Sequence, residues 1–317
     1  MFKTAVVGCG GIGGAHAAAW SRIPEAELCF VVDRIPEKAR ALADKYGCAA
    51  LTDAADLPAD LGCVSVTTPP AAHYPVAKSL LERGFHVFCE KPLTLHPEQG
   101  DELAALARQR GVKLDAGFKM RYEPIFRRAK ELLPQVGPLI SIVTTKCQQF
   151  HDRPEGQWVK DTGAMNELSI HDIDLVSFIS GLEPVRVLHA RLGHRWGWQA
   201  EDSFAVTAEY TGGVTACLQG CYCTDTIFQF RDLTITFLGE HGYMRVERPD
   251  RIVLHTDHFE VVEIPQDPVS TFDRELGDFM RCVQGLGPDP IPAEDAVRAT
   301  RLIEAARAAA GDPPLRG

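Results

Sequence analysis

Strand-like and helix-like segments alternate along the first 120 residues, and this alternation is the feature that most limits how the chain can fold. The apolar, strand-like runs are 4–9, 27–33, 63–67, 86–89 and 112–117. The helix-like runs between them are 12–22, 36–46, 71–84 and 97–110. Alternation of this kind predicts an α/β fold of βαβ units, with a mostly parallel sheet covered on both faces.

The pattern changes after residue 120, where helix-like segments lie at 123–133 and 165–180 and a strand-like run lies between them at 139–149. Strand-like runs then follow one another at 185–192, 203–210, 214–222, 228–238, 243–247, 252–255 and 259–264. Strands without intervening helices predict an antiparallel sheet. Helix-like runs at 272–285 and 293–310 close the chain, and we expect two domains, 1–120 and 121–317.

A glycine-rich segment lies directly between the first predicted strand and the first predicted helix. Residues 8–13 fit the pattern G-x-G-x-x-G, and the residues expected to contact a ligand are Gly8, Gly10, Gly11, Ile12 and Gly13. In this pattern the glycines allow a tight turn, a close approach to a pyrophosphate and close packing of helix on strand. The helix N-terminus then offers N–H donors to the phosphates. The segment therefore predicts dinucleotide binding.

The end of the second predicted strand carries an acidic residue at the spacing that this kind of site requires. Asp33 lies 20 residues after Gly13, where a carboxylate can bind the ribose hydroxyls. A carboxylate there favours NAD over NADP, because it repels a 2′-phosphate. Arg34 leaves NADP as the alternative, because a neighbouring arginine can hold that phosphate.

Two further strand ends are expected at the same ligand crevice, because ligands of open α/β sheets bind beyond the carboxyl ends of the strands. One is followed by Thr68 and Pro69, with His73 in the first turn of the next helix. The other ends in Glu90 and Lys91, followed by a proline. We expect these five residues to bind the cofactor. For Glu90 and Lys91 the alternative interpretation is a surface ion pair.

Several of these motifs together resemble a known family. They are the glycine loop followed by His16, the Thr-Pro-Pro-x-x-His segment, the Glu-Lys-Pro tripeptide and the sequence His-Asp-Ile-Asp-Leu at 171–175. In this order they resemble the Gfo/Idh/MocA family (glucose–fructose oxidoreductase and inositol dehydrogenase). The resemblance implies an N-terminal Rossmann domain and a C-terminal α+β domain with a large, mostly antiparallel open sheet. It also implies a nicotinamide cofactor, sugar or cyclitol substrates, and homodimers or homotetramers formed through the open sheets.

Alcohol oxidation requires a base for the hydroxyl proton and a cation that stabilises the developing alkoxide. His171 and Lys91 fit these two roles if the two domains face each other across a cleft. Glu167 precedes His171 by four residues and would share its helix face. Most family members have an Asp there, so we expect Glu167 to contact substrate or orient His171 with a different reach. Asp172 is expected on a solvated face, and Asp174 is expected to be a structural partner.

The resemblance also places four side chains near the nicotinamide and the substrate, although each is equally compatible with packing: Lys119, Arg121, Tyr122 and Trp158. The spacing of the ten cysteines and eleven histidines shows no ligand pattern, so no metal is expected. The net charge of −10 argues against binding to nucleic acid or to an anionic membrane. The N-terminus lacks the pattern of a secretion signal, which favours a cytoplasmic protein.

These features predict an NAD(P)-dependent oxidoreductase that transfers a hydride between nicotinamide and a secondary alcohol or ketone of a sugar, sugar derivative or cyclitol. One alternative is an NAD-dependent glycoside hydrolase or lyase that works through transient oxidation. The other is a dinucleotide-binding regulator without catalytic activity. The presence of both Lys91 and His171 argues against the regulator.

Overall fold

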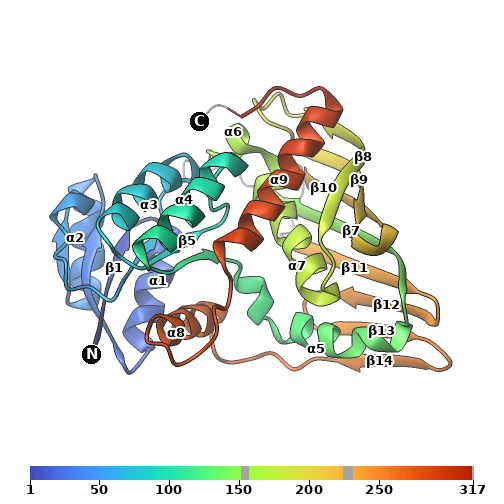
Figure 1. Cartoon of the computed structure of the whole chain (residues 1–317), viewed down its shortest axis with the longest axis horizontal. Helices are drawn as coiled ribbons and strands as arrows, with labels where there is room; N and C mark the ends of the chain where they lie inside the picture. The colour runs from blue at the N-terminus through green and yellow to red at the C-terminus, as the bar shows by residue number, and fades with distance from the viewer. Residues whose placement is uncertain (151–156, 224–230, 316–317) are drawn as a thin grey trace. The chain divides into compact units, whose positions relative to one another are not determined.

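The computed structural model describes residues 1–150, 157–223 and 231–315 (Figure 1). The chain divides into two compact units. The first unit contains Met1–Lys119 and Pro268–Val297, and the second unit contains Met120–Asp267 and Arg298–Gly317. The chain thus leaves the first unit next to the boundary expected from the sequence pattern. It then returns to that unit for 30 residues that the pattern alone assigns to the second.

The first unit is built on a six-stranded parallel sheet with the strand order β3-β2-β1-β4-β5-β6. Its strands are β1 (Phe2–Val7), β2 (Ala26–Val32), β3 (Ala49–Leu51), β4 (Cys63–Val66), β5 (Val87–Glu90) and β6 (Leu114–Gly117). This result confirms the predicted α/β fold with its parallel sheet. The strand order reverses between β1 and β4, which is where doubly wound sheets bind their ligands.

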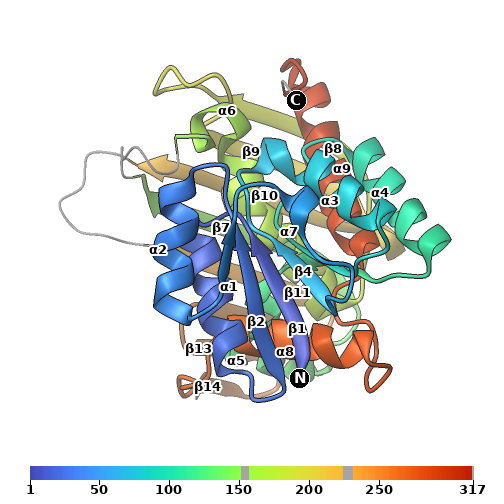
Figure 2. The ribbon, with the colours of Figure 1, turned by 90° about the vertical axis from the view of Figure 1, so that its left-hand side faces the viewer.

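The helices of the first unit form two groups that pack on the sheet, one containing α1, α2 and α8 and the other α3 and α4 (Figure 2). Their bounds are α1 (Gly11–Arg22), α2 (Pro36–Tyr46), α3 (His73–Glu82), α4 (Pro97–Arg110) and α8 (Thr271–Val283), with short 3-10 helices η1 (Ala54–Asp56) and η2 (Pro70–Ala72). Trp20 of α1, Phe88 of β5 and Phe279 of α8 belong to one buried cluster. Helix α8 is therefore part of the core of this unit, although it lies far from α1 in the sequence.

The second unit contains an eight-stranded sheet with the order β14-β13-β12-β11-β7-β10-β9-β8. Only the β7–β10 pairing is parallel among the pairings of this sheet that the structure describes, so the predicted mostly antiparallel sheet is confirmed. Its strands are β7 (Leu139–Gln149), β8 (Pro184–Gly193), β9 (Ser203–Tyr210), β10 (Val214–Cys223), β11 (Arg231–Gly239), β12 (Gly242–Glu247), β13 (Arg251–His255) and β14 (Phe259–Glu263). Positions 228–230 of one predicted strand lie outside the described residues.

Helices α5 and α7 lie along one face of this sheet (Figure 1). The helices are α5 (Pro124–Leu132), α6 (Val159–Ala164), the π-helix η5 (Met165–Ser169) and α7 (Ile170–Ser180), with short turns η4 (Leu133–Val136) and η6 (Thr211–Gly213). Helix α9 (Ala293–Ala310) begins in the first unit and ends in the second. Within the described ranges, no helix has the length and apolar character needed to cross a bilayer.

Candidate functional site

The glycine loop, residues 8–13, shows why two of its positions require glycine. Gly8 has a φ of +104°, and a Cβ there would lie 2.7 Å from the backbone of Thr67 and Thr68. A Cβ on Gly13 would lie 1.8 Å from the carbonyl oxygen of Gly8. At Gly10, by contrast, a Cβ would meet no described atom within 4 Å. The loop is thus packed tightly against the end of β4 and open where Gly10 starts α1.

Asp33, at the end of β2, is held beside the glycine loop. Its Oδ2 accepts the N–H of Cys9 at 2.8 Å, and its Oδ1 accepts the N–H of Ile35 at 2.9 Å. Each carboxylate oxygen accepts one backbone hydrogen bond and has capacity for another. Burial, and then the nearby Asp33, raise the pKa of the Cys9 thiol to about 12, so Cys9 stays uncharged. Arg34, next to Asp33, is exposed.

His73 joins the two remaining loops of the predicted cofactor site. Its Nδ1 lies 2.7 Å from the carbonyl oxygen of Pro92, and its Nε2 lies 2.8 Å from the carbonyl oxygen of Thr68. Burial lowers the pKa of His73, while the two carbonyl contacts oppose this effect. A neutral imidazole has one N–H and donates to only one of the two oxygens. The sequence analysis expected His73 to contact the cofactor, and the structure shows it linking two backbone loops.

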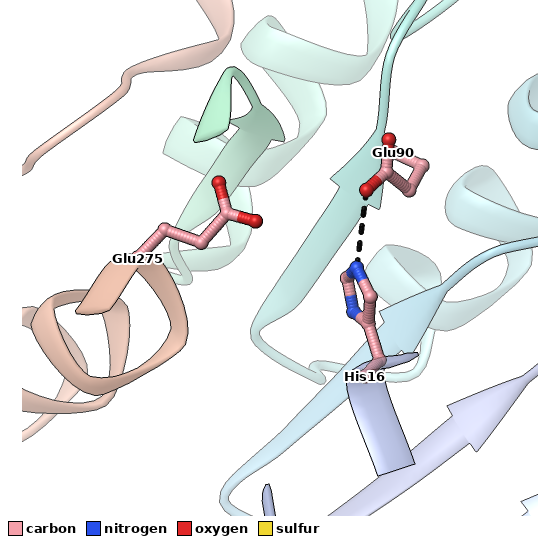
Figure 3. Close-up of side chains that lie close together, drawn as sticks. All are labelled: His16, Glu90 and Glu275. Carbon is pink, nitrogen blue, oxygen red and sulfur yellow. Dashed lines mark hydrogen bonds and ion pairs between the residues drawn. The ribbon is translucent and has the colours of Figure 1, made fainter. Parts of the chain in front are cut away.

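Glu90 connects the second of these loops to the helix that follows the glycine loop. Its Oε1 lies 3.1 Å from Nε2 of His16, and its Oε2 accepts the N–H of Lys91 at 3.1 Å (Figure 3). Glu90 is only 7% exposed, which rules out the alternative of a surface carboxylate. Burial raises the pKa of Glu90, but His16, Lys119 and Lys91 together outweigh burial and lower it. Glu90 is therefore ionised at neutral pH.

Glu275 of α8 points toward the same pair of side chains (Figure 3). It is fully buried, and neither carboxylate oxygen has a hydrogen-bond partner among the described residues. Burial and then the neighbouring Glu90 raise its pKa well above the usual range, and Lys119 only partly opposes them. The surroundings of Glu275 therefore favour the protonated form of its carboxyl group.

The types of residue in this group would also suit a divalent cation, since His16, Glu90 and Glu275 place ligand atoms within 4.8 Å of one another. However, Glu90 already bonds His16 directly. The Lys119 ammonium lies 4.2 Å from the ring centre of Phe272, which itself packs edge-on against the His16 ring. The Lys119 charge lowers the pKa of both carboxyl groups. Burial and Glu90 raise the pKa of Glu275 despite this charge, which favours a proton on that carboxyl group.

In the second unit, Glu167 and His171 lie on one continuous helical segment that we call the His171 helix, formed by η5 and α7. Glu167 lies in the π turn and is half-buried, and His171 is buried on α7. A π turn contains more residues than an α turn. The four-residue spacing of Glu167 and His171 therefore does not by itself put them on one face, as an α-helical reading of the sequence predicts.

Two buried ion pairs hold the His171 helix. Lys146 of β7 donates to Asp172 Oδ1 at 3.0 Å and to the carbonyl oxygen of Leu168 at 2.7 Å. Arg121 donates through two nitrogens to the carboxylate of Asp174. The expectation of a solvated Asp172 is wrong, because its carboxylate is fully buried against the Lys146 ammonium. Asp174 is confirmed as a structural partner.

Besides Lys119, described above, three residues were expected near the substrate, and their surroundings differ. Arg121 is 8% exposed, and its guanidinium forms an ion pair with Asp174 of the His171 helix. Tyr122 is buried, with the Arg127 guanidinium over its ring. The backbone oxygen of Trp158, at the start of α6, accepts the Thr162 hydroxyl. The contacts of Arg121 and Tyr122 are compatible with the packing alternative, and a contact of any of these side chains with substrate stays a prediction.

The sequence analysis missed four buried charged residues that support these sites: Glu275, Lys146, Glu201 and Arg307. The burial of Lys146 could have been predicted from the sequence. It lies two and four residues after Thr144 and Ile142, which places all three on the buried face of β7. The sequence pattern indicates the burial of Glu275 less clearly, because the residue lies directly before Leu276 on the apolar stripe of α8. Glu201 lies in a loop without any periodic pattern.

Two family models match consecutive parts of the chain. The model "Oxidoreductase family, NAD-binding Rossmann fold" matches residues 2–118, and the model "GFO/IDH/MocA C-terminal domain" matches residues 126–245. The chain belongs to the GFO/IDH/MocA family. The resemblance inferred from the motifs is thereby confirmed, and the first unit contains the NAD-binding Rossmann domain of this family.

Among relatives within the GFO/IDH/MocA family, inositol 2-dehydrogenase of Rhizobium meliloti (strain 1021) is 31% identical over 185 residues, which is 57% of this chain and 56% of that protein. The chain thus aligns with just over half of that relative's length. D-glucoside 3-dehydrogenase of Escherichia coli (strain K12) is 26% identical over 93% of this chain and 90% of its own length. The crystal structure of GenD2 from gentamicin A biosynthesis in complex with NAD has a TM-score of 0.85 and 25% identity, covering 98% of this chain and 94% of that one.

The residues present fit NAD, as the family requires. The open face at Gly10 leaves space where the helix N-terminus meets a pyrophosphate, and the Asp33 carboxylate keeps acceptor capacity for ribose hydroxyls. The Thr68 hydroxyl oxygen is buried without a hydrogen-bond partner among the described residues. A buried polar atom of this kind is usually satisfied by a ligand or by water.

Proposed function

We propose that this protein is an NAD-dependent dehydrogenase that oxidises a secondary hydroxyl group of a sugar, sugar derivative or cyclitol, or reduces the corresponding ketone. The observation that supports this most strongly is the placement of Lys91. Its backbone N–H is bonded to Glu90, and Glu90 is bonded to His16 of the helix that begins at the glycine loop. Two hydrogen bonds thus connect Lys91 to the helix that begins at the glycine loop.

In the proposed reaction each side chain has a separate task. Lys91 holds the substrate oxygen and stabilises negative charge as the hydroxyl loses its proton. His171 takes that proton on a ring nitrogen, because an imidazole has a pKa suited to general base catalysis near neutrality. Glu167 binds a substrate hydroxyl or orients His171. NAD, when bound, accepts the hydride from the carbon atom.

The substrate class is supported by relatives of the chain. Inositol 2-dehydrogenase and D-glucoside 3-dehydrogenase are named for oxidation of ring carbons that bear hydroxyl groups. UDP-N-acetylglucosamine 3-dehydrogenase of Acidithiobacillus ferrooxidans is 30% identical over 58% of this chain and 56% of its own length. The proposal extends this class, a ring with several secondary hydroxyl groups, to the present protein.

We propose NAD rather than NADP as the working cofactor. The Asp33 carboxylate lies against the glycine loop through its bond to Cys9, and a 2′-phosphate beside it would meet a negative charge. The neighbouring Arg34 is exposed. We expect a kcat/KM ratio in favour of NAD, and we expect Asp33→Ala to reduce that preference without abolishing activity.

The test is a panel of cyclitols, aldoses, glycosides and uronic acids with each nicotinamide cofactor, followed by absorbance of the reduced cofactor. One reduced cofactor formed per substrate oxidised supports the proposal. Product formed without net reduced cofactor would instead indicate hydrolysis or elimination through transient oxidation. NAD binding without turnover of any compound would indicate a regulator.

We also propose that the protein assembles as a homodimer or homotetramer through the second unit's sheet. Val143 and Cys217 are neighbours in register on β7 and β10, and both are exposed. Exposed apolar side chains on a broad sheet favour association. Sedimentation equilibrium of the wild type and of Val143→Asp tests this proposal, and a monomeric wild type would contradict it.

A further inference from the structure

The backbone takes an unusual turn just before the His171 helix. Gly163 has φ and ψ of 89° and 166°, a conformation essentially restricted to glycine. A Cβ at this position would lie 2.3 Å from Oε1 of Glu201. The turn ends α6 and brings the chain against the Glu201 carboxylate, so that Ala164 and Met165 begin a new helical segment.

Glu201 accepts the first two amide groups of this new segment. Its backbone oxygen accepts the N–H of Ala164 at 2.8 Å, and its Oε1 accepts the N–H of Met165 at 2.8 Å. The first N–H groups of a helix have no partners within the helix, and its N-terminus favours negative charge. A carboxylate that lies 36 residues later in the chain therefore caps the helix.

Arg307 of α9 fixes Glu201 from the opposite side. Its guanidinium pairs with Glu201 Oε2 and donates to the carbonyl oxygen of Thr162 at 3.3 Å. Arg307 is 4% exposed and Glu201 is fully buried. Burial raises the pKa of Glu201, and the Arg307 charge opposes this rise. Removing one partner of a buried pair leaves the other without compensation, so the two act as a unit.

The cap lies directly before the π turn. Met165 donates its N–H to Glu201, and its carbonyl oxygen accepts the N–H of Ile170, which is five residues later. Bonds of this i→i+5 type are rare and are retained where the surrounding structure enforces them. The π turn contains Glu167 and ends at Ser169, and His171 lies two residues after that end. Any relaxation of this turn to α-helix would rotate Glu167 relative to His171.

We propose that Glu201 and Arg307 are positioning residues that preserve the π turn and thereby set Glu167 relative to His171. The inference rests on the proposed function for its catalytic consequence. Its structural part, the capped π turn, is independent of that function. The Lys146–Asp172 and Arg121–Asp174 pairs bind α7 farther along. The Glu201–Arg307 pair acts on the start of the helix.

The test compares Glu201→Gln, Arg307→Lys and Arg307→Met with the wild type, and uses Arg186→Ala as the control. Arg186 forms an exposed ion pair with Glu209 in the same unit. Two readouts are required: hydrogen exchange of the peptide that covers residues 164–170, and the pH profiles of kcat and kcat/KM.

We expect faster exchange at 164–170 in Glu201→Gln and Arg307→Met, a smaller effect in Arg307→Lys, and none in Arg186→Ala. We also expect kcat to fall roughly tenfold to a hundredfold, because the base is misplaced. The acidic limb of the pH profile should shift, because that limb follows the deprotonation of the base. The KM for NAD should change little. A purely structural role would lower the melting temperature without moving the pH profile.

Glu201→Gln or Arg307→Met with wild-type exchange and a wild-type pH profile would overturn the inference. The proposed function fails differently, namely if His171→Ala keeps normal turnover. In that case the exchange experiment still decides whether the pair preserves the turn.

Discussion

The two units place their functional side chains in different ways. In the first unit, short sequence motifs carry the site: Gly8 and Gly13 close the turn, and Glu90 accepts the N–H of the adjacent Lys91. In the second unit, buried ion pairs between distant segments fix the His171 helix. The first arrangement can be read along the chain, and the second depends on the folded structure. Four predictions test this contrast.

The largest expected effect is on the rate of the reaction, and we expect it to be equal for one residue from each unit. We expect Lys91→Ala and His171→Ala each to lower kcat by roughly 10²–10⁴, which corresponds to about 3–5 kcal/mol of activation free energy. Exposed Lys45→Ala and His189→Ala serve as controls and should have near-normal rates. Steady-state kinetics on the substrate identified by the panel make the measurement. A variant at Lys91 or His171 with wild-type turnover would remove that residue from the mechanism.

The next effect concerns stability in the second unit. Lys146→Met leaves the buried Asp172 carboxylate without its cation, and we expect a loss of roughly 3–5 kcal/mol in the free energy of unfolding. Urea denaturation measures this loss. The double variant Lys146→Met with Asp172→Leu should recover a large part of it, because no buried charge remains. If the single variant loses less than the exposed-pair variant Arg186→Ala, ion pairs do not hold this helix.

A smaller effect tests the local character of the first unit. In Gly13→Ala the new Cβ meets the carbonyl oxygen of Gly8 at 1.8 Å, so the loop must shift. We expect a loss of roughly 1–3 kcal/mol in stability together with weaker NAD binding. Gly14→Ala is the matched control, because a Cβ there meets nothing within 4 Å and alanine favours helix by up to about 1 kcal/mol. Calorimetric titration with NAD compares the two. Equal affinities would show that the close approach is unimportant.

The smallest effect is a pH dependence at Glu275. Because burial and Glu90 raise its pKa in the folded state, Glu275 contributes most below its unfolded pKa of about 4.5. That contribution is lost as the pH rises toward the folded value, at up to about 1.4 kcal/mol per pH unit. Glu275→Gln removes the titrating group. The facing charges, Glu90, Lys119 and Asp115, are the same in both proteins.

We therefore expect the stability of the wild type relative to Glu275→Gln to fall as the pH rises from about 5, which melting temperatures across pH will show. A difference that does not vary with pH would mean that Glu275 is ionised throughout. A wild type that gains stability from Mn²⁺, while Glu275→Gln does not, would point to a cation in place of the proton.

The contrast between the units also explains which predictions from sequence succeeded. The helices 36–46, 97–110 and 293–310 and the strand 139–149 were predicted with their observed bounds, because proline, glycine and hydrophobic periodicity mark their ends. The three-residue edge strand β3 was missed, because it contains no periodic signal. The motifs identified the glycine loop and the Glu-Lys-Pro segment correctly as features of the first unit.

The burial of Asp172 was not predicted, because its partner lies on β7 and nothing local identifies that contact. The π turn was missed for a related reason. An α-helical repeat is the default for such a sequence, and the departure at Met165 depends on the contact with Glu201. In general, the surroundings of a residue could be predicted where its neighbours in the chain form them. The partners of charges paired across the fold could not be predicted.

The return of α8 to the first unit limits how this protein can be divided. A fragment that stops near residue 120 would keep the glycine loop, but it would lose Leu276 and Phe279, which bury Trp20 and its apolar neighbours. Such a fragment would expose an apolar surface on α1 and would be prone to aggregate. A chimaera that borrows this nucleotide-binding module must therefore carry two pieces of chain, residues 1–119 and residues 268–297, joined by a short bridge.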